Sequence, residues 1–290
     1  MARTAFEFRA RDKILELGVR TRLMGVVNLT PDSFSDGGRF RDAREAVDYC
    51  LQLVEDGVDI LDLGGESSRP GAVPVSADEE WSRVGPVLEA IRSRTPAMIS
   101  IDTWKAAVAL RCLEAGADLV NDISALRFDP RMAEVVAEFR AGIVLMQMRG
   151  TPATMQRIPP SPDILSEVVD DLQVSLNQAH KSHIPHDRIL LDPGIGFGKT
   201  VDDNLVLINR LPELARLDRP ILVGPSRKRW IGAILDRPVG ERLVGTLGAC
   251  AVCILRGAHV LRVHDAKEVR QVADITDAIL AEQAGTVIDA

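Results

Sequence analysis

The sequence predicts an α/β fold, a single (β/α)8 TIM barrel with an N-terminal β-hairpin. Three observations lead to this prediction. Short apolar runs alternate with helical patterns along the whole chain. The runs lack the apolar–polar alternation of a half-exposed strand, so they suit strands buried on both faces of a parallel sheet. Several helical patterns end at a glycine just before the next run, where a helix C-cap favours a left-handed residue.

The first element is a predicted β-hairpin. Residues 5–22 alternate between apolar and polar side chains, with Arg11 and Asp12 at the turn. This hairpin is placed to close one end of the barrel.

The strands come next. Four apolar runs follow the glycines Gly57, Gly116, Gly142 and Gly257, and others follow turns that contain Pro or Asp. Together with the run after the hairpin they predict eight strands: 23–28, 58–63, 97–101, 118–122, 142–147, 188–192, 220–224 and 258–263.

Helical patterns occupy the intervals between the strands. They are expected at 42–56, 77–93, 104–115, 130–140, 163–182, 202–215, 227–256 in two pieces, and 266–283. Asp129-Pro130 and Ser161-Pro162 are typical of an N-cap followed by a first-turn proline. Eight strand–helix units in alternation form a barrel. The alternative is a doubly wound open sheet, which would need fewer strands and usually a glycine-rich turn after the first one. That turn is absent from this sequence.

Composition limits the classes of partner. The 290 residues are 46% hydrophobic, enough for a sizeable core. No linker divides the chain, so we expect one domain over 1–290, with the hairpin at 5–22 and the barrel at 23–283. The net charge is −7. An acidic chain has no general attraction for nucleic acid or anionic membranes. We therefore expect small-molecule partners, with any anionic ligand bound by a local cluster of Arg and Lys.

The four cysteines indicate a reduced, cytoplasmic protein. Cys50, Cys112, Cys250 and Cys253 all lie inside apolar, helix-like patterns. Cys250 and Cys253 form a C-x-x-C, but no second pair and no nearby His completes a zinc site. Their spacing fits one buried helix face better. The N-terminus lacks the apolar core of a signal peptide, and no long apolar run predicts a transmembrane span.

The loop from Asn28 to Gly38 follows the first barrel strand directly. It combines amide, hydroxyl and carboxylate side chains with Pro31, Phe34 and a glycine pair. A long polar loop after a buried strand is typical of a binding loop, because ligands of α/β proteins lie at the carboxyl ends of strands. We expect this loop to close over a small-molecule site; the alternative is an ordinary surface turn.

Polar residues stand at the end of every predicted strand. They are Asn28; Asp62 with 66–71; Asp102; Asn121; Gln147 and Arg149; Asp192 with 193–199; Gly224 with 225–228; and Arg262 with His264. In a barrel these ends meet at one mouth, so we expect a common site there. Individually, each could instead be a helix cap or a solvated rim residue; Asp102, for example, could cap the helix that follows it.

These residues fall into two chemical groups. Asp102, Asn121 and Asp192 are acceptor-rich and suit a flat heterocycle with N–H and NH₂ donors on its edge. The cationic group suits phosphate or carboxylate and comprises Arg69, Arg227, Lys228, Arg262 and His264. The segment 194–200 is similar to a phosphate-binding P-loop, but that motif requires glycine at position 193, which is Pro193 here.

Seven segments resemble the signatures of the dihydropteroate synthase family and occur in that family's order. They are 24–38, 66–72, 100–103, 121–123, 192–199, 226–228 and 262–264. The resemblance implies condensation of 6-hydroxymethyl-7,8-dihydropterin diphosphate with para-aminobenzoate. It also implies release of pyrophosphate, use of Mg²⁺ and a place in folate synthesis. A homodimer formed through the late helices is a further implication, and the apolar stretch 243–256 is compatible with it.

The resemblance also implies residue roles. Asp102, Asn121, Asp192 and Lys228 would hold the pterin, and Asn28 would reach the metal and the pyrophosphate. Arg69, Arg262 and His264 would surround the anionic groups. The aminobenzoate would be bordered by Phe34, Ser68, Arg69 and Phe197, with Gly224 and Ser226 completing the substrate-binding set. Catalysis would fall to Asn28, Asp102, Asp192, Lys228, Arg262 and His264.

Three positions depart from commoner family patterns: Gln147 where many members have His, Arg229 where many have Ser, and Ser68 where many have Thr. One alternative reading is a pterin-binding methyltransferase on the same barrel, acting on a methylated folate. Such an enzyme has no need for the Asn28 loop or for the anion site at Arg262 and His264. The other alternative is a catalytically silent pterin-binding relative.

Overall fold

The computed structural model describes residues 3–30, 40, 42–69 and 71–283, and it confirms the predicted barrel. Eight parallel strands form one sheet in the order β8-β7-β6-β5-β4-β3-β10-β9. Their bounds are β3 Arg22–Asn28, β4 Ile60–Gly64, β5 Met98–Asp102, β6 Leu119–Asp122, β7 Gly142–Met146, β8 Ile189–Asp192, β9 Leu222–Val223 and β10 Val260–Val263. A parallel bridge between Leu191 and Ile221 brings the two ends of the sheet together, so the barrel is nearly closed.

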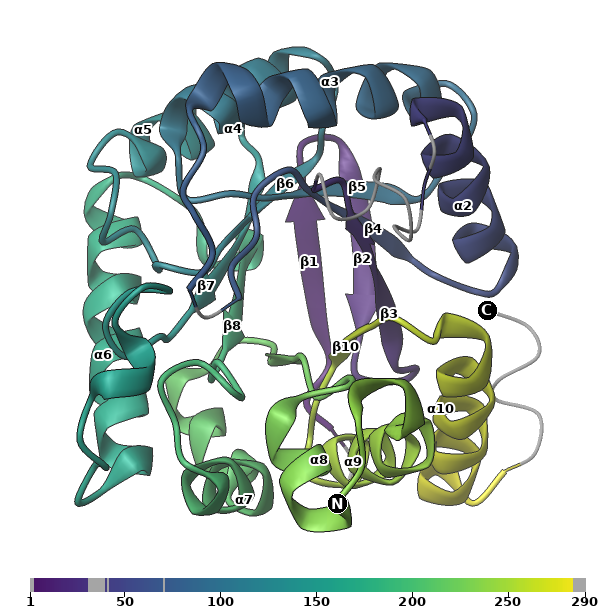
Figure 1. Ribbon diagram of the computed structural model, residues 1–290, viewed down its shortest axis with the longest axis vertical. Coiled ribbons are helices and arrows are strands. Elements are labelled where there is room, and N and C mark those ends of the chain that lie inside the picture. The colour runs from purple at the N-terminus through teal and green to yellow at the C-terminus, as the bar shows by residue number, and fades with distance from the viewer. Residues whose placement is uncertain (1–2, 31–39, 41, 70, 284–290) are drawn as a thin grey trace.

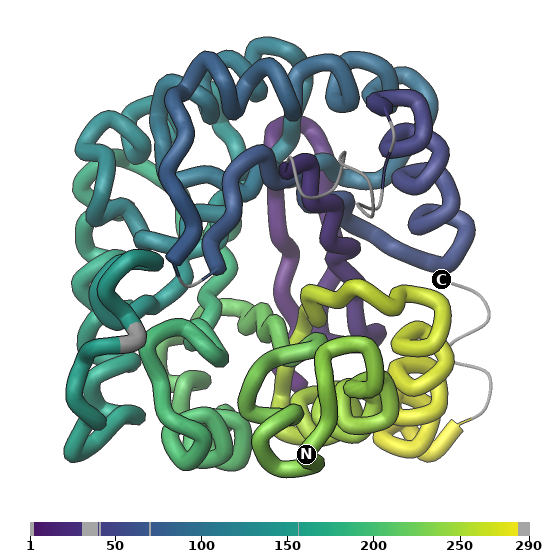
Figure 2. Tube along the Cα trace, viewed as in Figure 1, coloured from purple at the N-terminus to yellow at the C-terminus, as the bar shows by residue number. Residues whose placement is uncertain are grey.

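Helices surround the strands (Figure 1). They are α2 Ala43–Glu55, α3 Ala77–Arg92, α4 Ala106–Glu114, α5 Met132–Glu138, α6 Ile164–Lys181, α7 Val201–Asn209, α8 Arg229–Leu235, α9 Leu243–Leu255 and α10 Ala266–Ala281. The chain trace in Figure 2 shows the last strand returning beside the first barrel strand, as the pairing of Val260 with Arg22 requires.

Both helix starts that were predicted from a cap followed by proline are shifted in the structure. Helix α5 begins at Met132, two residues after Pro130. One carboxylate oxygen of Asp129 accepts the N–H of Arg131 at 3.0 Å, and the other accepts the N–H of Ala106 at 2.8 Å, at the start of α4. Helix α6 is capped by Asp163, whose side chain accepts from the N–H of Ser166, so Ser161 is not its N-cap.

The predicted hairpin consists of β1 Phe6–Ala10 and β2 Lys13–Leu17, paired antiparallel. It packs against the amino-terminal ends of the barrel strands and, drawn in purple, lies inside the ring of helices in Figure 1. Phe8 is fully buried. A Cβ added to Gly142 would lie 2.6 Å from the Phe8 ring, so the ring occupies the space that a side chain at 142 would need. The expectation that the hairpin closes one end of the barrel is confirmed.

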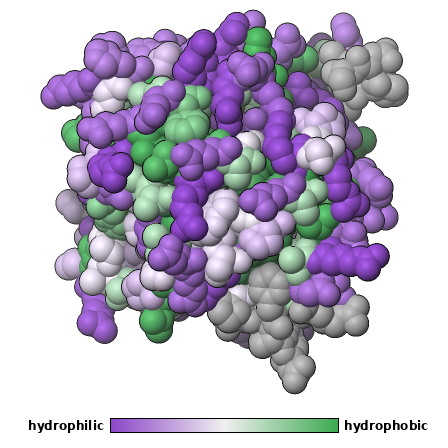
Figure 3. All heavy atoms as spheres, turned by 90° about the horizontal axis from the view of Figure 1, so that it is seen from above, coloured by the Kyte–Doolittle hydropathy of each residue, from purple (hydrophilic) through white to green (hydrophobic). Residues whose placement is uncertain are grey.

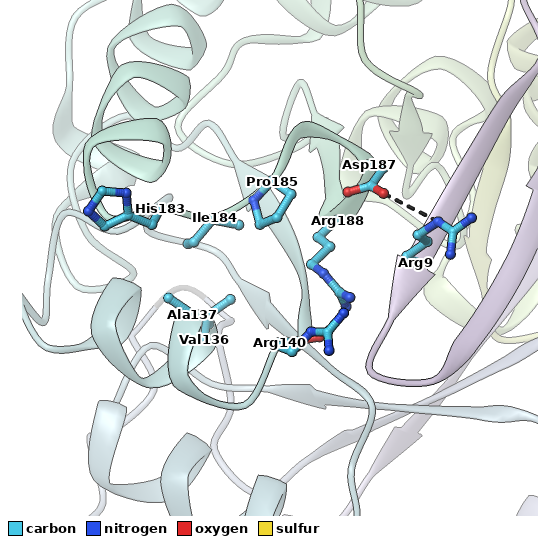
Figure 4. Close-up of a pocket in the computed structure, with 9 residues that line it drawn as sticks. All are labelled: Arg9, Val136, Ala137, Arg140, His183, Ile184, Pro185, Asp187 and Arg188. Carbon is cyan, nitrogen blue, oxygen red and sulfur yellow. Dashed lines mark hydrogen bonds and ion pairs between the residues drawn. The ribbon is translucent and has the colours of Figure 1, made fainter.

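A small hollow lies at this closed end. It has a volume of about 300 Å³ and lies between β1, the end of α5 and the 3₁₀ turn His186–Arg188. Arg9 and Asp187 face each other across it at 3.3 Å (Figure 4). Arg188 donates to the backbone carbonyls of Arg140 and Arg11. These contacts tie the hairpin to the base of the barrel.

A polar network joins the start of the chain to its last helix. Asp277 on α10 is 4% exposed and accepts from Arg3 at 2.5 Å. It also accepts the backbone N–H of Thr21 at 2.6 Å and the Thr21 hydroxyl at 2.8 Å. Arg3 in turn donates to the Thr21 hydroxyl at 2.6 Å. This network fixes the segment before β3 against α10.

The apolar core lies mainly between the strands and the helices, with a second layer inside the barrel against the hairpin. Cys50, Cys112, Cys250 and Cys253 are buried and free, as predicted. Figure 3, which views the molecule from the α3 side, shows hydrophilic side chains over most of that face with smaller hydrophobic areas between them. In the described part of the chain, no helix is both long enough and apolar enough to cross a membrane.

Candidate active site

A cavity of about 930 Å³ opens at the carboxyl ends of the strands, where the polar residues were predicted to meet. Its lining includes Asn28 at the end of β3 and Thr30 after it, 66–69 after β4, Asp102 at the end of β5, 196–197 and 199–201 after β8, Gly224 and 226–230 after β9, and Arg262 and His264 on and after β10. Residues from six strand ends therefore share one space. Asp192 and Asn121 are not among the lining residues; they are buried, at 4% and 3% exposure.

The floor is a cluster of carboxylates around one guanidinium. Arg262 donates from Nε to Asp62 and from Nη2 to Asp102, both at 2.6 Å. Asn121 donates its amide NH₂ to the same oxygen of Asp62 at 3.1 Å. Asp102 and Asn121 are register partners on β5 and β6, which places their Cα atoms side by side. Strand pairing thus brings together acceptors that lie far apart in the sequence.

Asp62 was not predicted as a site residue, although it was noted at its strand end. It is fully buried, and its second carboxylate oxygen has no hydrogen-bond partner among the described residues. A buried charged side chain in the middle of an otherwise apolar strand, Ile60–Gly64, was the available signal. Asp62 accepts from both Arg262, which lines the cavity, and Asn121, and so holds these two side chains together.

Burial governs the charges of the floor. It raises the pKa of Asp102 to about 7, although the adjacent Arg262 acts in the opposite direction. Burial also raises the pKa of Asp192, against the hydrogen bond that this carboxylate accepts from the N–H of Gly194 at 2.7 Å. The pKa of Lys228 is lowered to about 8 by burial and by Arg262. The site therefore contains groups that exchange protons near neutral pH.

His264 differs from the expectation that it is cationic. Burial and the neighbouring Arg262 lower its pKa to about 3, so the imidazole is neutral at physiological pH. Its Nδ1 lies 3.0 Å from the hydroxyl of Ser226, which also accepts the backbone N–H of His264 at 3.2 Å. His264 can thus offer hydrogen bonds to an anion but no charge. Arg227, also expected to be cationic, pairs through two nitrogens with Asp265.

The remaining predicted residues lie around the cavity. Ser68 and Arg69 are on the loop after β4. Gly224 lies beside Arg262: a Cβ added to Gly224 would lie 3.8 Å from the Cβ of Arg262. The Phe197 ring lies under the ammonium of Lys228, 4.2 Å from ring centroid to Nζ. Phe34 and most of its loop lie outside the described residues.

The three unusual positions are placed differently. Arg229 and Ser68 line the cavity. Gln147 is 1% exposed and does not line it. It lies behind the loop that follows β8, bonded to Asp171 and Lys199. The substitution of Gln for His thus alters the support of the cavity wall and not its surface.

Comparison with known proteins identifies the family of this chain. The profile of the family described as "Pterin binding enzyme" matches residues 24–264. The dihydropteroate synthase of Synechocystis sp. is 44% identical over 267 residues, which cover 92% of this chain and 92% of that protein. The Bacillus subtilis enzyme of the same name is 43% identical, over 90% of this chain and 89% of its own length.

Solved structures show the same likeness. The Yersinia pestis dihydropteroate synthase, solved as a sulfonamide drug complex, has a TM-score of 0.90 and 37% identity, covering 95% of this chain and 100% of that one. The Xanthomonas albilineans dihydropteroate synthase with 4-aminobenzoic acid has a TM-score of 0.88 and 40% identity, covering 96% and 99%. The chain belongs to the pterin-binding enzyme family, within its group of dihydropteroate synthases.

Proposed function

We propose that this enzyme condenses 6-hydroxymethyl-7,8-dihydropterin diphosphate with para-aminobenzoate to give 7,8-dihydropteroate and pyrophosphate. The observation that carries the proposal is the composition of one cavity: a buried acceptor-rich floor directly beside cationic and hydrogen-bonding groups. A substrate with a donor-edged heterocycle at one end and a diphosphate at the other matches both halves.

The pterin is assigned to the floor. Asn121 gives its NH₂ to Asp62, so its carbonyl oxygen is the atom left to accept from the ring. Asp192 uses one oxygen for the N–H of Gly194, which leaves the other for ring donors. Asp102 accepts in the same way, and Lys228 donates to ring acceptors. Each assignment matches an available atom to an edge atom of the pterin.

The diphosphate is assigned to Arg262, His264 and Asn28, with Arg69 at the rim. Among the described residues, no group of three or more His, Cys, Asp or Glu side chains could hold a metal ion. Mg²⁺ is commonly bound by substrate phosphates and only one or two protein oxygens. The amide of Asn28 is such an oxygen ligand in the cavity, so the donor set fits a Mg²⁺ that enters with the diphosphate. Bound there, Mg²⁺ would neutralise charge on the departing pyrophosphate.

The chain's own residues then position the substrates and stabilise the charges that develop during the reaction. An aryl amine is neutral at pH 7 and already nucleophilic, so the site needs no strong general base. The difficult step is cleavage of the C–O bond to pyrophosphate. Arg262 and the neutral His264 stabilise the charge that develops there. Asp102 and Asp192 lie on the pterin side and favour a cationic methylene. The amine nitrogen bonds to that carbon as the C–O bond to pyrophosphate breaks, and the amine proton passes to the departing pyrophosphate or to solvent.

We further propose a cytoplasmic homodimer formed through α7, α9 and α10. Large apolar side chains are exposed on these neighbouring helices: Leu205, Val206, Val244, Val252, Leu255, Ile275 and Ile279. Val244 alone is 80% exposed. Apolar surface gathered on one side of a protein supports an interface there, and the four free cysteines support a reducing compartment.

Turnover with the two substrates and Mg²⁺ tests the function. We expect dihydropteroate and pyrophosphate in equal amounts, detected by chromatography and a coupled phosphate assay. Omission of either substrate should abolish both products. An enzyme that binds the pterin but forms no product would refute the proposal and would favour a silent pterin-binding protein. Methyl transfer from a methylated folate, measured in parallel, should be absent.

A further inference from the structure

Lys199 is a cation in the cavity wall to which the proposed reaction assigns no role. Its ammonium lies 2.6 Å from the side-chain oxygen of Gln147, 3.3 Å from the backbone oxygen of Gln147 and 3.2 Å from the carbonyl oxygen of Phe197. An ammonium has three donors, and these three acceptors use them all. Lys199 is therefore engaged with the protein and not poised toward a ligand.

Gln147 is oriented for this contact. Its amide nitrogen donates to Asp171 on α6 at 2.9 Å, which turns the amide oxygen toward Lys199. Asp171, Gln147 and Lys199 thus form a chain in which each donor has an acceptor. Burial lowers the pKa of Lys199 to about 7, while Asp192 and Glu167 favour its charged form.

The loop that Lys199 supports lies directly on the end of β7. Gly194 and Gly198 both have φ of +68°, in the left-handed region that favours glycine. A Cβ at Gly194 would lie 1.8 Å from the backbone oxygen of Gln147, and one at Gly198 would lie 2.7 Å from the backbone oxygen of Arg149. No side chain fits between the loop and the strand end, so the loop has little space in which to shift inward.

Phe197 is the side chain that this loop presents to the cavity. Its ring contacts the ammonium of Lys228, and its backbone carbonyl accepts from Lys199. We propose that Lys199, held by Gln147, is a positioning residue that fixes Phe197 and thereby the aminobenzoate side of the cavity. This inference rests on the proposed function, in which Phe197 borders the aminobenzoate.

The competing role for Lys199 is direct contact with the diphosphate, since it lines the cavity. The two roles predict that loss of Lys199 raises the KM for different substrates. A positioning residue that acts through Phe197 changes the KM for aminobenzoate. A diphosphate ligand changes the KM for the pterin substrate and the affinity for pyrophosphate.

The test is a double-mutant cycle with Lys199→Met and Phe197→Leu, assayed by steady-state kinetics with both substrates. We expect Lys199→Met to raise the KM for aminobenzoate about fivefold to tenfold, within the range for coupled neighbours. The KM for the pterin diphosphate should change less than about twofold. In the Phe197→Leu background, Lys199→Met should add almost nothing, because the group it positions is gone. Lys181→Met, at an exposed position at the end of α6 and outside the proposed dimer interface, is the matched control for loss of a charge.

Three outcomes would overturn the assignment. The first is that Lys199→Met and Phe197→Leu have fully additive effects on the KM for aminobenzoate. The others are that Lys199→Met raises the KM for the pterin diphosphate more than the KM for aminobenzoate, or that it changes neither. If Lys199→Met does not fold, Gln147→Leu carries the test, because it keeps Lys199 but removes its side-chain acceptor, together with the amide donor to Asp171. A selective rise in aminobenzoate KM in that variant supports the proposal, and an unchanged KM overturns it. A parent enzyme without turnover refutes the proposed function and this inference together, whereas a working parent with unaffected variants refutes this inference alone.

Discussion

Replacement of Arg262 by Met tests the charge arrangement of the floor. Arg262 bonds two carboxylates whose side chains are 0% and 11% exposed, those of Asp62 and Asp102. Removing one partner of a buried ion pair usually costs 3–5 kcal/mol, because an uncompensated charge remains. Asp62 would keep the amide of Asn121, and Asp102 would keep the attraction of Lys228. We therefore expect a loss in the lower half of that range, about 3–4 kcal/mol in the free energy of unfolding at pH 7.

The pH dependence gives this prediction a second signature. The folded-state pKa of Asp102 is raised to about 7 from an ordinary value of 3.8, mainly by burial. A raised carboxyl pKa means that stability falls as pH rises from the unfolded pKa to the folded one. In the parent protein, the loss of stability that is linked to Asp102 is complete near pH 7. Arg262 holds the Asp102 pKa down, so its removal raises that pKa further and extends the fall above pH 7.

Urea denaturation of parent and variant between about pH 6 and pH 9 measures both effects, with the slope m confirming two-state unfolding. The difference in unfolding free energy should widen as pH rises. A loss below about 1 kcal/mol at pH 7, or a difference that narrows with pH, would refute the reasoning. Arg237→Met is the control, because Arg237 pairs with Glu241 at the surface, where both side chains are more than half exposed. Such a pair contributes at most about 0.5 kcal/mol.

Three further predictions follow from the site and the fold. Asp192→Asn replaces an acceptor with a donor against the pterin edge. Calorimetry should therefore show a loss of pterin affinity above about tenfold, with an unchanged melting temperature. Unchanged pterin affinity would mean that Asp192 serves only to accept the N–H of Gly194 and does not bind the pterin. The His264 ring should show no NMR titration between about pH 5 and pH 8, unlike an ordinary histidine with a pKa near 6.5. A titration midpoint within that range would mean that His264 can bind the anion as a cation after all. Phe8→Ala should cost about 3–5 kcal/mol in urea denaturation; a cost below about 1 kcal/mol would mean that the hairpin is not part of the cooperative core.

The barrel was predictable from sequence because its strands are buried on both faces. Runs such as Gly142–Met146 contain almost no polar residues, and the nearby glycines mark the ends of the helices. One contact of Asp129 was not predictable from local signals. Asp129 accepts the N–H of Arg131, as the local pattern suggests, but its other carboxylate oxygen accepts from Ala106, 23 positions earlier. Local capping patterns do not reveal such a contact.

The convergence of polar residues at one mouth was predictable from the sequence, but their charges were not, and the role of each residue stays a prediction. Parallel strands carry their end residues to one mouth, so residue type and position were enough to gather Asp102, Asp192 and Arg262. The neutral state of His264 depends on desolvation and on the distance to Arg262, which only the folded chain defines. The role of Asp62 likewise depends on partners 59 and 200 residues away.

The network of Arg3, Thr21 and Asp277 has a consequence for synthesis. Its members are up to 274 positions apart, and β3 also pairs with β10 at the far end of the chain. At about 5–20 residues per second, the ribosome needs roughly 14–55 s to add the residues between them. During that interval β3 has an unpaired edge, which is the kind of surface that associates with other chains. Closure of the barrel must therefore follow almost complete translation, and chaperone protection should matter most for nascent chains that end before α10.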